Sequence, residues 1–93
     1  MGLSTIPVDL KKVKPGEIDK QILRVGMGAE LDAVSLYEQM AALAKNLKIK
    51  EVLLDIAKEE KTHVGEFQAL LLKLDREQEK EMAEGKKEVD EKI

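Results

Sequence analysis

Apolar residues recur every three or four positions along most of this chain, which is the spacing of one face of an α-helix. The first stripe, between residues 17 and 45, consists of Leu23, Met27, Glu30, Val34, Tyr37, Ala41 and Ala44. The second stripe, between residues 48 and 74, consists of Ile49, Leu53, Ile56, Glu60, His63, Phe67, Leu70 and Leu74. Because no alternating strand pattern competes with either stripe, two long helices are predicted.

The expected boundaries of these helices come from Pro and Asn. Pro15 is expected in the first helical turn, where its missing backbone donor has no cost. Asn46 is the best candidate for the end of the first helix, since Asn tolerates the left-handed conformation found at helix C-termini. The second helix then begins near Lys48, and two helices joined by so short a connection are expected to form an antiparallel hairpin.

The rest of the chain differs in composition from this hairpin. An extended N-terminal arm, the hairpin and a charged tail are predicted at residues 1–14, 15–75 and 76–93. The tail is almost entirely Glu, Lys, Arg and Gln, and Gly85 interrupts its apolar stripe, which consists of Met82, Val89 and Ile93. We expect a short C-terminal helix there, or a segment that stays disordered until it docks. The predicted fold class is all-α.

Three ionisable side chains interrupt the apolar stripes, namely Glu30 on the first helix and Glu60 and His63 on the second. Burying an unpaired carboxylate costs several kcal/mol, so a small protein that buries two of them needs compensation, which a divalent cation can supply. A hairpin that turns near residue 46 places Glu30 opposite position 62, between Glu60 and His63. We therefore expect the three side chains to converge and to bind metal.

The residue types indicate which metal chemistry to expect. Di-iron carboxylate bundles use one Glu from each of two helices and a Glu-x-x-His pair from each of the other two. This chain supplies half of that set, and His63 is its only histidine. A homodimeric four-helix bundle would complete a di-iron centre shared between two subunits. Carboxylates with a single imidazole suit iron or manganese, and the expected reaction is oxidation of Fe(II) to Fe(III). Tyr37, two turns beyond Glu30, could hold a ligand carboxylate or line the site.

Composition excludes several other classes of protein. The absence of Cys excludes disulfides, zinc knuckles and thiolate nucleophiles, and it fits a reducing cytoplasm. Charged residues make up 38% of the chain but the net charge is only -3, so no basic footprint for nucleic acid exists. No apolar run approaches the roughly 18 residues of a membrane span, and the N-terminus does not resemble a signal peptide. We expect a cytoplasmic protein with no membrane or nucleic-acid partner.

The stretch from residue 22 to about residue 74 resembles the encapsulated ferritin-like proteins, which are half-size relatives of ferritin and rubrerythrin. The similarity is strongest over residues 29–40 and 53–67. The family's metal-ligand spacing looks like that of Glu30, Glu60 and His63. The resemblance implies a ferroxidase centre at a dimer interface, an annular decamer and residence within an encapsulin nanocompartment, whose shell stores the oxidised iron. In some members the ferritin-like part is fused to the shell protein, so this chain could be free or part of such a fusion.

Two alternative functions stay open. A rubrerythrin-like di-iron peroxidase would use the same ligands, but no Cys is present for a rubredoxin-type electron-transfer centre. A non-enzymatic helical adaptor would merely tolerate a structural metal. A Glu-x-x-His pair alone is weak support for metal binding, and the prediction depends on its joint placement with Glu30. The acidic residues expected to face solvent are Asp32, Glu38, Glu59 and Glu66.

Overall fold

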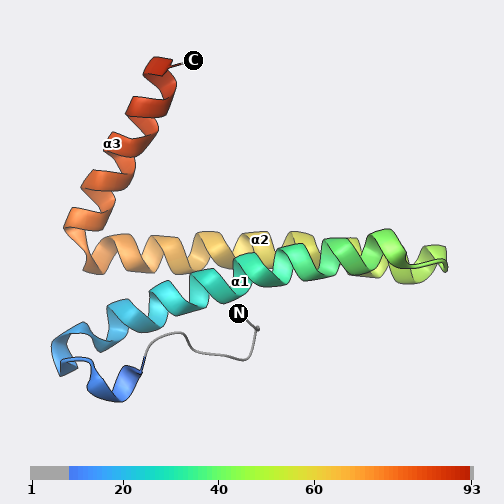
Figure 1. The fold of residues 1–93 in the computed structure, drawn as a ribbon, viewed down its shortest axis with the longest axis horizontal. Helices are drawn as coiled ribbons and strands as arrows, with labels where there is room; N and C mark the ends of the chain where they lie inside the picture. Colours follow the sequence, from blue (N-terminus) through green and yellow to red (C-terminus); the bar gives the residue numbers. More distant parts are fainter. Residues whose placement is uncertain (1–8, 93) are drawn as a thin grey trace.

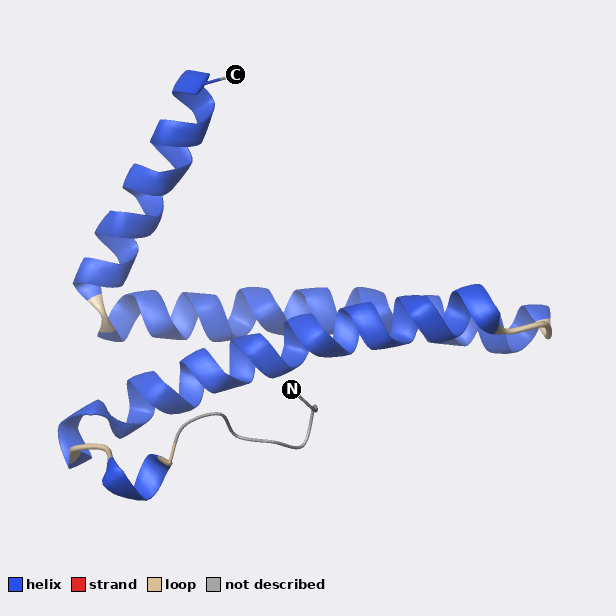
Figure 2. Ribbon diagram, viewed as in Figure 1, coloured by secondary structure: helices blue, strands red, loops and turns tan. Residues whose placement is uncertain are grey.

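The computed structural model describes residues 9–92, and every regular element in that range is helical (Figure 2). The three long helices are α1 (Ile18–Leu43), α2 (Leu47–Leu74) and α3 (Arg76–Lys92). Two short 3-10 helices precede them, η1 (Leu10–Lys12) and η2 (Pro15–Glu17). Figure 1 shows α1 and α2 as an antiparallel hairpin, with α3 projecting from the open end. The all-α prediction is confirmed.

The start of the hairpin follows from Pro15. This residue occupies the first turn of η2, after Lys14 in an extended conformation (φ -59°, ψ 139°). A proline there loses no intrahelical hydrogen bond, and its fixed φ suits a helix start. Of the extended arm predicted at residues 1–14, residues 1–8 lie outside the described part of the chain. The described remainder is not fully extended, because it contains the short helix η1.

The turn of the hairpin is built differently from the prediction. Asn46 is extended (φ -79°, ψ 122°), and its Oδ1 accepts hydrogen bonds from the Lys48 and Ile49 amides at 2.9 and 3.1 Å. The prediction that Asn46 ends the first helix in a left-handed conformation is wrong, since no residue in 9–92 has a positive φ. Asn46 is instead the N-cap of α2, where it satisfies two amides that the first turn leaves unpaired.

Only part of the predicted apolar surface is buried in a single chain. The buried apolar residues are Leu23, Ala33, Ala41, Ala57 and Leu71. Most are small, which lets α1 and α2 approach closely. Other members of the predicted stripes are half exposed on one face of the hairpin, namely Ile49, Leu70 and Leu74. The apolar stripe is therefore wider than one partner helix can cover.

The chain is extended for its length. Its radius of gyration is 16.3 Å, whereas a compact chain of this size has about 12 Å. Among the described elements, α3 packs only against α2, near the junction between them (Figure 1). None of the described helices combines the length and the apolar character that a membrane crossing requires.

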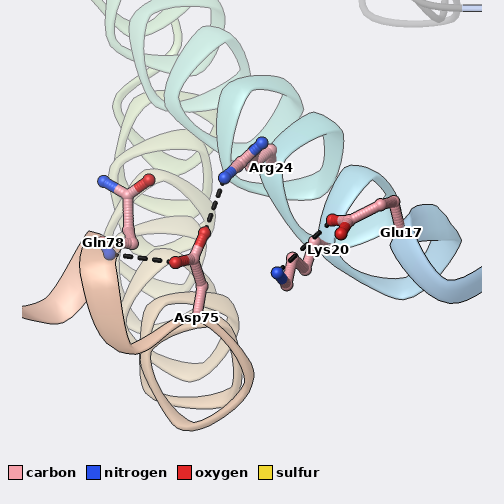
Figure 3. Close-up of polar contacts among 5 residues, drawn as sticks. All are labelled: Glu17, Lys20, Arg24, Asp75 and Gln78. Atoms are coloured by element: carbon pink, nitrogen blue, oxygen red, sulfur yellow. Dashed lines mark hydrogen bonds and ion pairs between the residues drawn. The ribbon is translucent and has the colours of Figure 1, made fainter.

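The junction between α2 and α3 is held by Asp75 (Figure 3). Its Oδ1 accepts a hydrogen bond from the backbone N–H of Gln78 at 3.0 Å, and its Oδ2 accepts one from the guanidinium of Arg24 in α1 at 2.6 Å. The charged tail therefore forms a capped helix. That helix continues through Gly85, so this glycine does not break it as the sequence had suggested.

Candidate metal centre

Glu30 of α1 and Glu60 and His63 of α2 converge at one point of the hairpin. Each offers one possible ligand atom, and these atoms all lie within 4.8 Å of one another. The His63 Nδ1 lies 3.4 Å from Glu30 Oε2 and 3.7 Å from Glu60 Oε1. The predicted convergence is observed, and metal ligation by these side chains stays a prediction.

Helix geometry and hairpin register together produce this cluster. Residues three apart project from the same face of a helix, which brings Glu60 beside His63. The register of the hairpin places Glu30 within 3.4 Å of His63 itself, one residue from the predicted position 62. One turn away, Gly26 lies against the ring of Phe67 in the same register.

The electrostatics of the cluster favour a cation. Glu30 Oε2 is inaccessible to solvent and has no hydrogen-bond partner among the described residues. Its distance to His63 Nδ1 exceeds the usual 2.7–3.2 Å of an N–H···O hydrogen bond. A buried carboxylate oxygen without a partner is costly unless a proton or metal ion binds it. Two carboxylates and one imidazole match the ligand preference of iron or manganese, so the residues present fit such an ion.

Two members of the cluster, Glu30 and His63, line an open cavity on the face of the hairpin. The cavity is lined by Glu30, His63, Glu66, Phe67 and Leu70. The side chain of His63 is 44% exposed, against 22% for Glu30 and 18% for Glu60. The imidazole is therefore the most exposed of the three side chains.

Three residues differ from their expected places or roles. Glu66 is exposed as expected, but it also lines the cavity, which its position one turn after His63 could have indicated. Asp32 is half-buried, not solvated, and its Oδ2 is inaccessible without a hydrogen-bond partner among the described residues, a feature that nothing in the structure explains. Tyr37 is half-buried and lies about 10 Å of helix rise beyond Glu30. Its hydroxyl is hydrogen-bonded to none of the described residues.

Comparisons with known proteins agree with this architecture. A family model described as rubrerythrin matches residues 21–93. The chain is 48% identical over 91 residues to a ferritin-like–encapsulin shell fusion protein of Pyrococcus furiosus, a match that covers 96% of the chain and 26% of that relative. The chain thus spans about a quarter of the length of that curated relative.

The fold is also similar to a solved structure. The crystal structure of the encapsulated ferritin domain from Pyrococcus furiosus matches with a TM-score of 0.82 and 50% sequence identity, over 97% of this chain and 94% of that one. The predicted resemblance to encapsulated ferritin-like proteins is confirmed. Because the family model matches residues 21–93 and both relatives share about half of their aligned residues with this chain, the chain belongs to the rubrerythrin family of ferritin-like proteins.

Proposed function

We propose that the chain is a ferroxidase that oxidises Fe(II) to Fe(III) at a di-iron centre formed by Glu30, Glu60 and His63 of two copies. The observation that carries the proposal is an incomplete ligand set on an uncovered apolar face. One chain offers three ligand atoms within 4.8 Å of one another. A di-iron carboxylate centre in a four-helix bundle uses six such residues, which is the inventory of two chains.

The position of the cluster supports a two-fold dimer. It lies near the middle of both α1 and α2, so a two-fold axis that passes through it and is perpendicular to the helices would place the turn of one hairpin beside the open end of the other. Exposed apolar side chains lie on both sides of the cluster: Ile49 and Val52 toward the turn, and Ile22, Leu70 and Leu74 toward the open end. The resulting four-helix bundle would cover both groups and remove their apolar surface from water.

The roles of the side chains follow from their chemistry. The two carboxylates carry negative charge that stabilises Fe(III) more than Fe(II), which favours loss of an electron. The imidazole of His63 supplies the nitrogen donor of each chain. Two Fe(II) ions give up one electron each, and dioxygen takes the pair together with two protons to become hydrogen peroxide. Tyr37 is proposed to orient a ligand carboxylate through its hydroxyl.

The resemblance to encapsulated ferritin-like proteins motivates the proposed assembly, and the names of two relatives support the proposed location. One is a fusion of a ferritin-like part with an encapsulin shell, and another is an encapsulated ferritin domain. We infer that the homodimer assembles into an annular decamer that associates with an encapsulin shell protein. In this proposal the protein works in the cytoplasm, within an encapsulin nanocompartment that stores the oxidised iron.

Fe(II) oxidation under dioxygen tests the proposed function. Glu30→Ala, Glu60→Ala and His63→Ala should each lower the oxidation rate strongly. Loss of a residue that only supports a metal ligand lowers activity about 10–100-fold, and loss of a ligand itself should lower it more. Glu59→Ala is the matched control, since Glu59 is exposed and adjacent to Glu60. If Glu59→Ala were as damaging as Glu60→Ala, the assignment of the ligands would be wrong.

The same assay separates the two alternatives. Oxidation that continues beyond two irons per dimer supports iron storage. Faster consumption of hydrogen peroxide when an electron donor is added would support the rubrerythrin-like peroxidase. A tightly held metal that is never oxidised would support the non-enzymatic helical adaptor.

A further inference from the structure

We propose that the ring of Phe67, seated on Gly26, is a positioning element of the metal centre. It sets the separation of α1 and α2 at the ligands and closes the centre on the side of the hairpin's open end. This inference rests on the proposed function. It assigns roles to two residues that are not ligands.

The contact between Gly26 and Phe67 leaves no room for a side chain at position 26. A Cβ atom there would lie 2.9, 3.1 and 3.2 Å from three ring carbons of Phe67, namely Cε1, Cζ and Cδ1. A contact under 3.0 Å requires that something shift. Gly28, two residues later in the same helix, has no such neighbour within 4 Å of its hypothetical Cβ.

The backbone does not explain the glycine at this position. No glycine among residues 9–92 has a positive φ, so Gly26 has a conformation that any residue adopts. Glycine inside a helix is less stable than alanine. The three atoms nearest to a Cβ at position 26 all belong to the Phe67 ring, and this ring accounts for the glycine.

The contact lies one turn from the ligands on both helices. Gly26 precedes Glu30 by four residues on α1, and Phe67 follows His63 by four residues on α2. Phe67 also lines the same cavity as Glu30 and His63. The ring is therefore a spacer next to the point where the carboxylate and the imidazole must meet.

A rigid spacer at this place controls the centre because close packing transmits small displacements. Relieving a 2.9 Å contact requires a shift of several tenths of an ångström, by the ring or by one helix relative to the other. Metal sites hold their ligand distances within about 0.2 Å. Separation of the helices would pull Glu30 away from His63, whereas rotation of the ring would open the cavity wall to water.

Co(II) is a suitable probe, since its absorption spectrum reports ligand geometry without turnover. The full chain is titrated with Co(II), and both the affinity and the spectrum are recorded. Gly26→Ala should bind Co(II) at least about tenfold more weakly with an altered spectrum, while Gly28→Ala should stay within about twofold of wild type. Both variants gain a helix-favouring alanine, and far-UV circular dichroism verifies that both fold.

Rescue by a second substitution separates positioning from general destabilisation. Phe67→Leu makes room at position 26, so Gly26→Ala should change Co(II) affinity by less than about threefold in the Phe67→Leu background. An equal effect of Gly26→Ala in both backgrounds overturns the proposal. If Gly26→Ala does not fold, Phe67→Leu decides alone, and wild-type affinity and spectrum in that variant overturn the proposal.

Failure of the proposed function gives a different result. A wild-type chain that binds no Co(II), or that binds it equally well after His63→Ala, overturns the centre and this inference together. If the wild-type chain binds Co(II) but Gly26→Ala and Gly28→Ala have the same Co(II) affinity and spectrum, only the positioning role is overturned.

Discussion

Arg24 donates a 2.6 Å hydrogen bond to Asp75, a residue that follows it by 51 positions in the chain. The bond ties the second turn of α1 to the junction between α2 and α3 (Figure 3). Asp75 uses Oδ2 for Arg24 and Oδ1 for the Gln78 amide. One carboxylate therefore both caps α3 and anchors it to the hairpin.

The two tasks of Asp75 can be separated by substitution. Asp75→Asn keeps an oxygen for the Gln78 amide but loses the charge that pairs with Arg24, whereas Asp75→Ala loses both interactions. We expect hydrogen exchange at residues 76–80 to accelerate strongly in Asp75→Ala and less in Asp75→Asn. Equal acceleration in the two variants would show that the cap contributes nothing beyond the ion pair.

The stability of the protein should depend on pH through Asp75. The hydrogen bond from Gln78 is the main cause that lowers its pKa; burial opposes this shift, and Arg24 and Lys20 add to it. Because the folded pKa is the lower one, the stabilisation is complete above the unfolded value of about 3.9 and is lost as the pH falls through the folded value. Urea midpoints should therefore decline below about pH 4 in wild type, and less steeply in Asp75→Asn. The difference between the two series of urea midpoints gives the contribution of Asp75, apart from that of the other carboxylates.

The cap at the hairpin turn should have a measurable effect on stability. Asn46→Ala removes the acceptor of two hydrogen bonds at the start of α2. Loss of such a cap costs typically about 1 kcal/mol, so the thermal midpoint should fall at fixed protein concentration. Asn46→Asp keeps the acceptor and should stay near wild type. A drop of the same size in Asn46→Asp would contradict the capping role.

The exposed apolar face can be tested with two matched leucines of α2. Leu70 is 53% exposed and lines the cavity beside His63, while Leu54 is 47% exposed. Viewed down the axis of α2, the direction of Leu54 differs from that of Glu60 by about a third of a full rotation. Leu70→Gln should weaken the proposed dimer by at least about tenfold in dissociation constant, because it removes apolar area from the interface. Leu54→Gln should leave the mass measured by light scattering nearly unchanged at the same concentration. If Leu54→Gln weakened the dimer more than Leu70→Gln, the dimer interface would lie on the other face of the hairpin.

Metal binding should stabilise the assembled state. A ligand that binds only the dimer shifts the equilibrium by mass action, by about 2.7 kcal/mol at one hundred times its dissociation constant. Light scattering under anaerobic conditions should therefore show more dimer with Fe(II) than without it, and His63→Ala should lose the difference. A folded monomer that binds Fe(II) would contradict the shared centre.

Much of the fold could be predicted because helical periodicity is local. The stripes of α1 and α2 are visible in single windows of sequence, and their ends agree with the observed helices to within a few residues. The role of Asn46 could not be decided in this way, since the same residue suits the end of one helix or the start of the next. The start of α3 could have been predicted from Asp75, which lies three residues before Gln78 in the pattern of a helix N-cap.

The candidate centre could be predicted only in part. Glu30, Glu60 and His63 could be selected because they interrupt apolar stripes, and their meeting followed from the position of the turn. The contact of Phe67 with Gly26 depends on a separation of helices that no local pattern specifies. Helical phase places Gly26, but not Gly28, on the face of Glu30, and only packing shows that an aromatic ring lies against Gly26.

The three-residue connection between α1 and α2 also has a kinetic consequence. Helices joined so closely can pair first beside the turn, between residues near in sequence, and such intramolecular pairing takes microseconds to milliseconds regardless of dilution. The proposed shared centre instead requires two finished hairpins to collide, a step whose rate rises with the square of chain concentration. Sparse chains would thus fold without a complete centre, and the ability to oxidise iron would appear only once the chain is abundant.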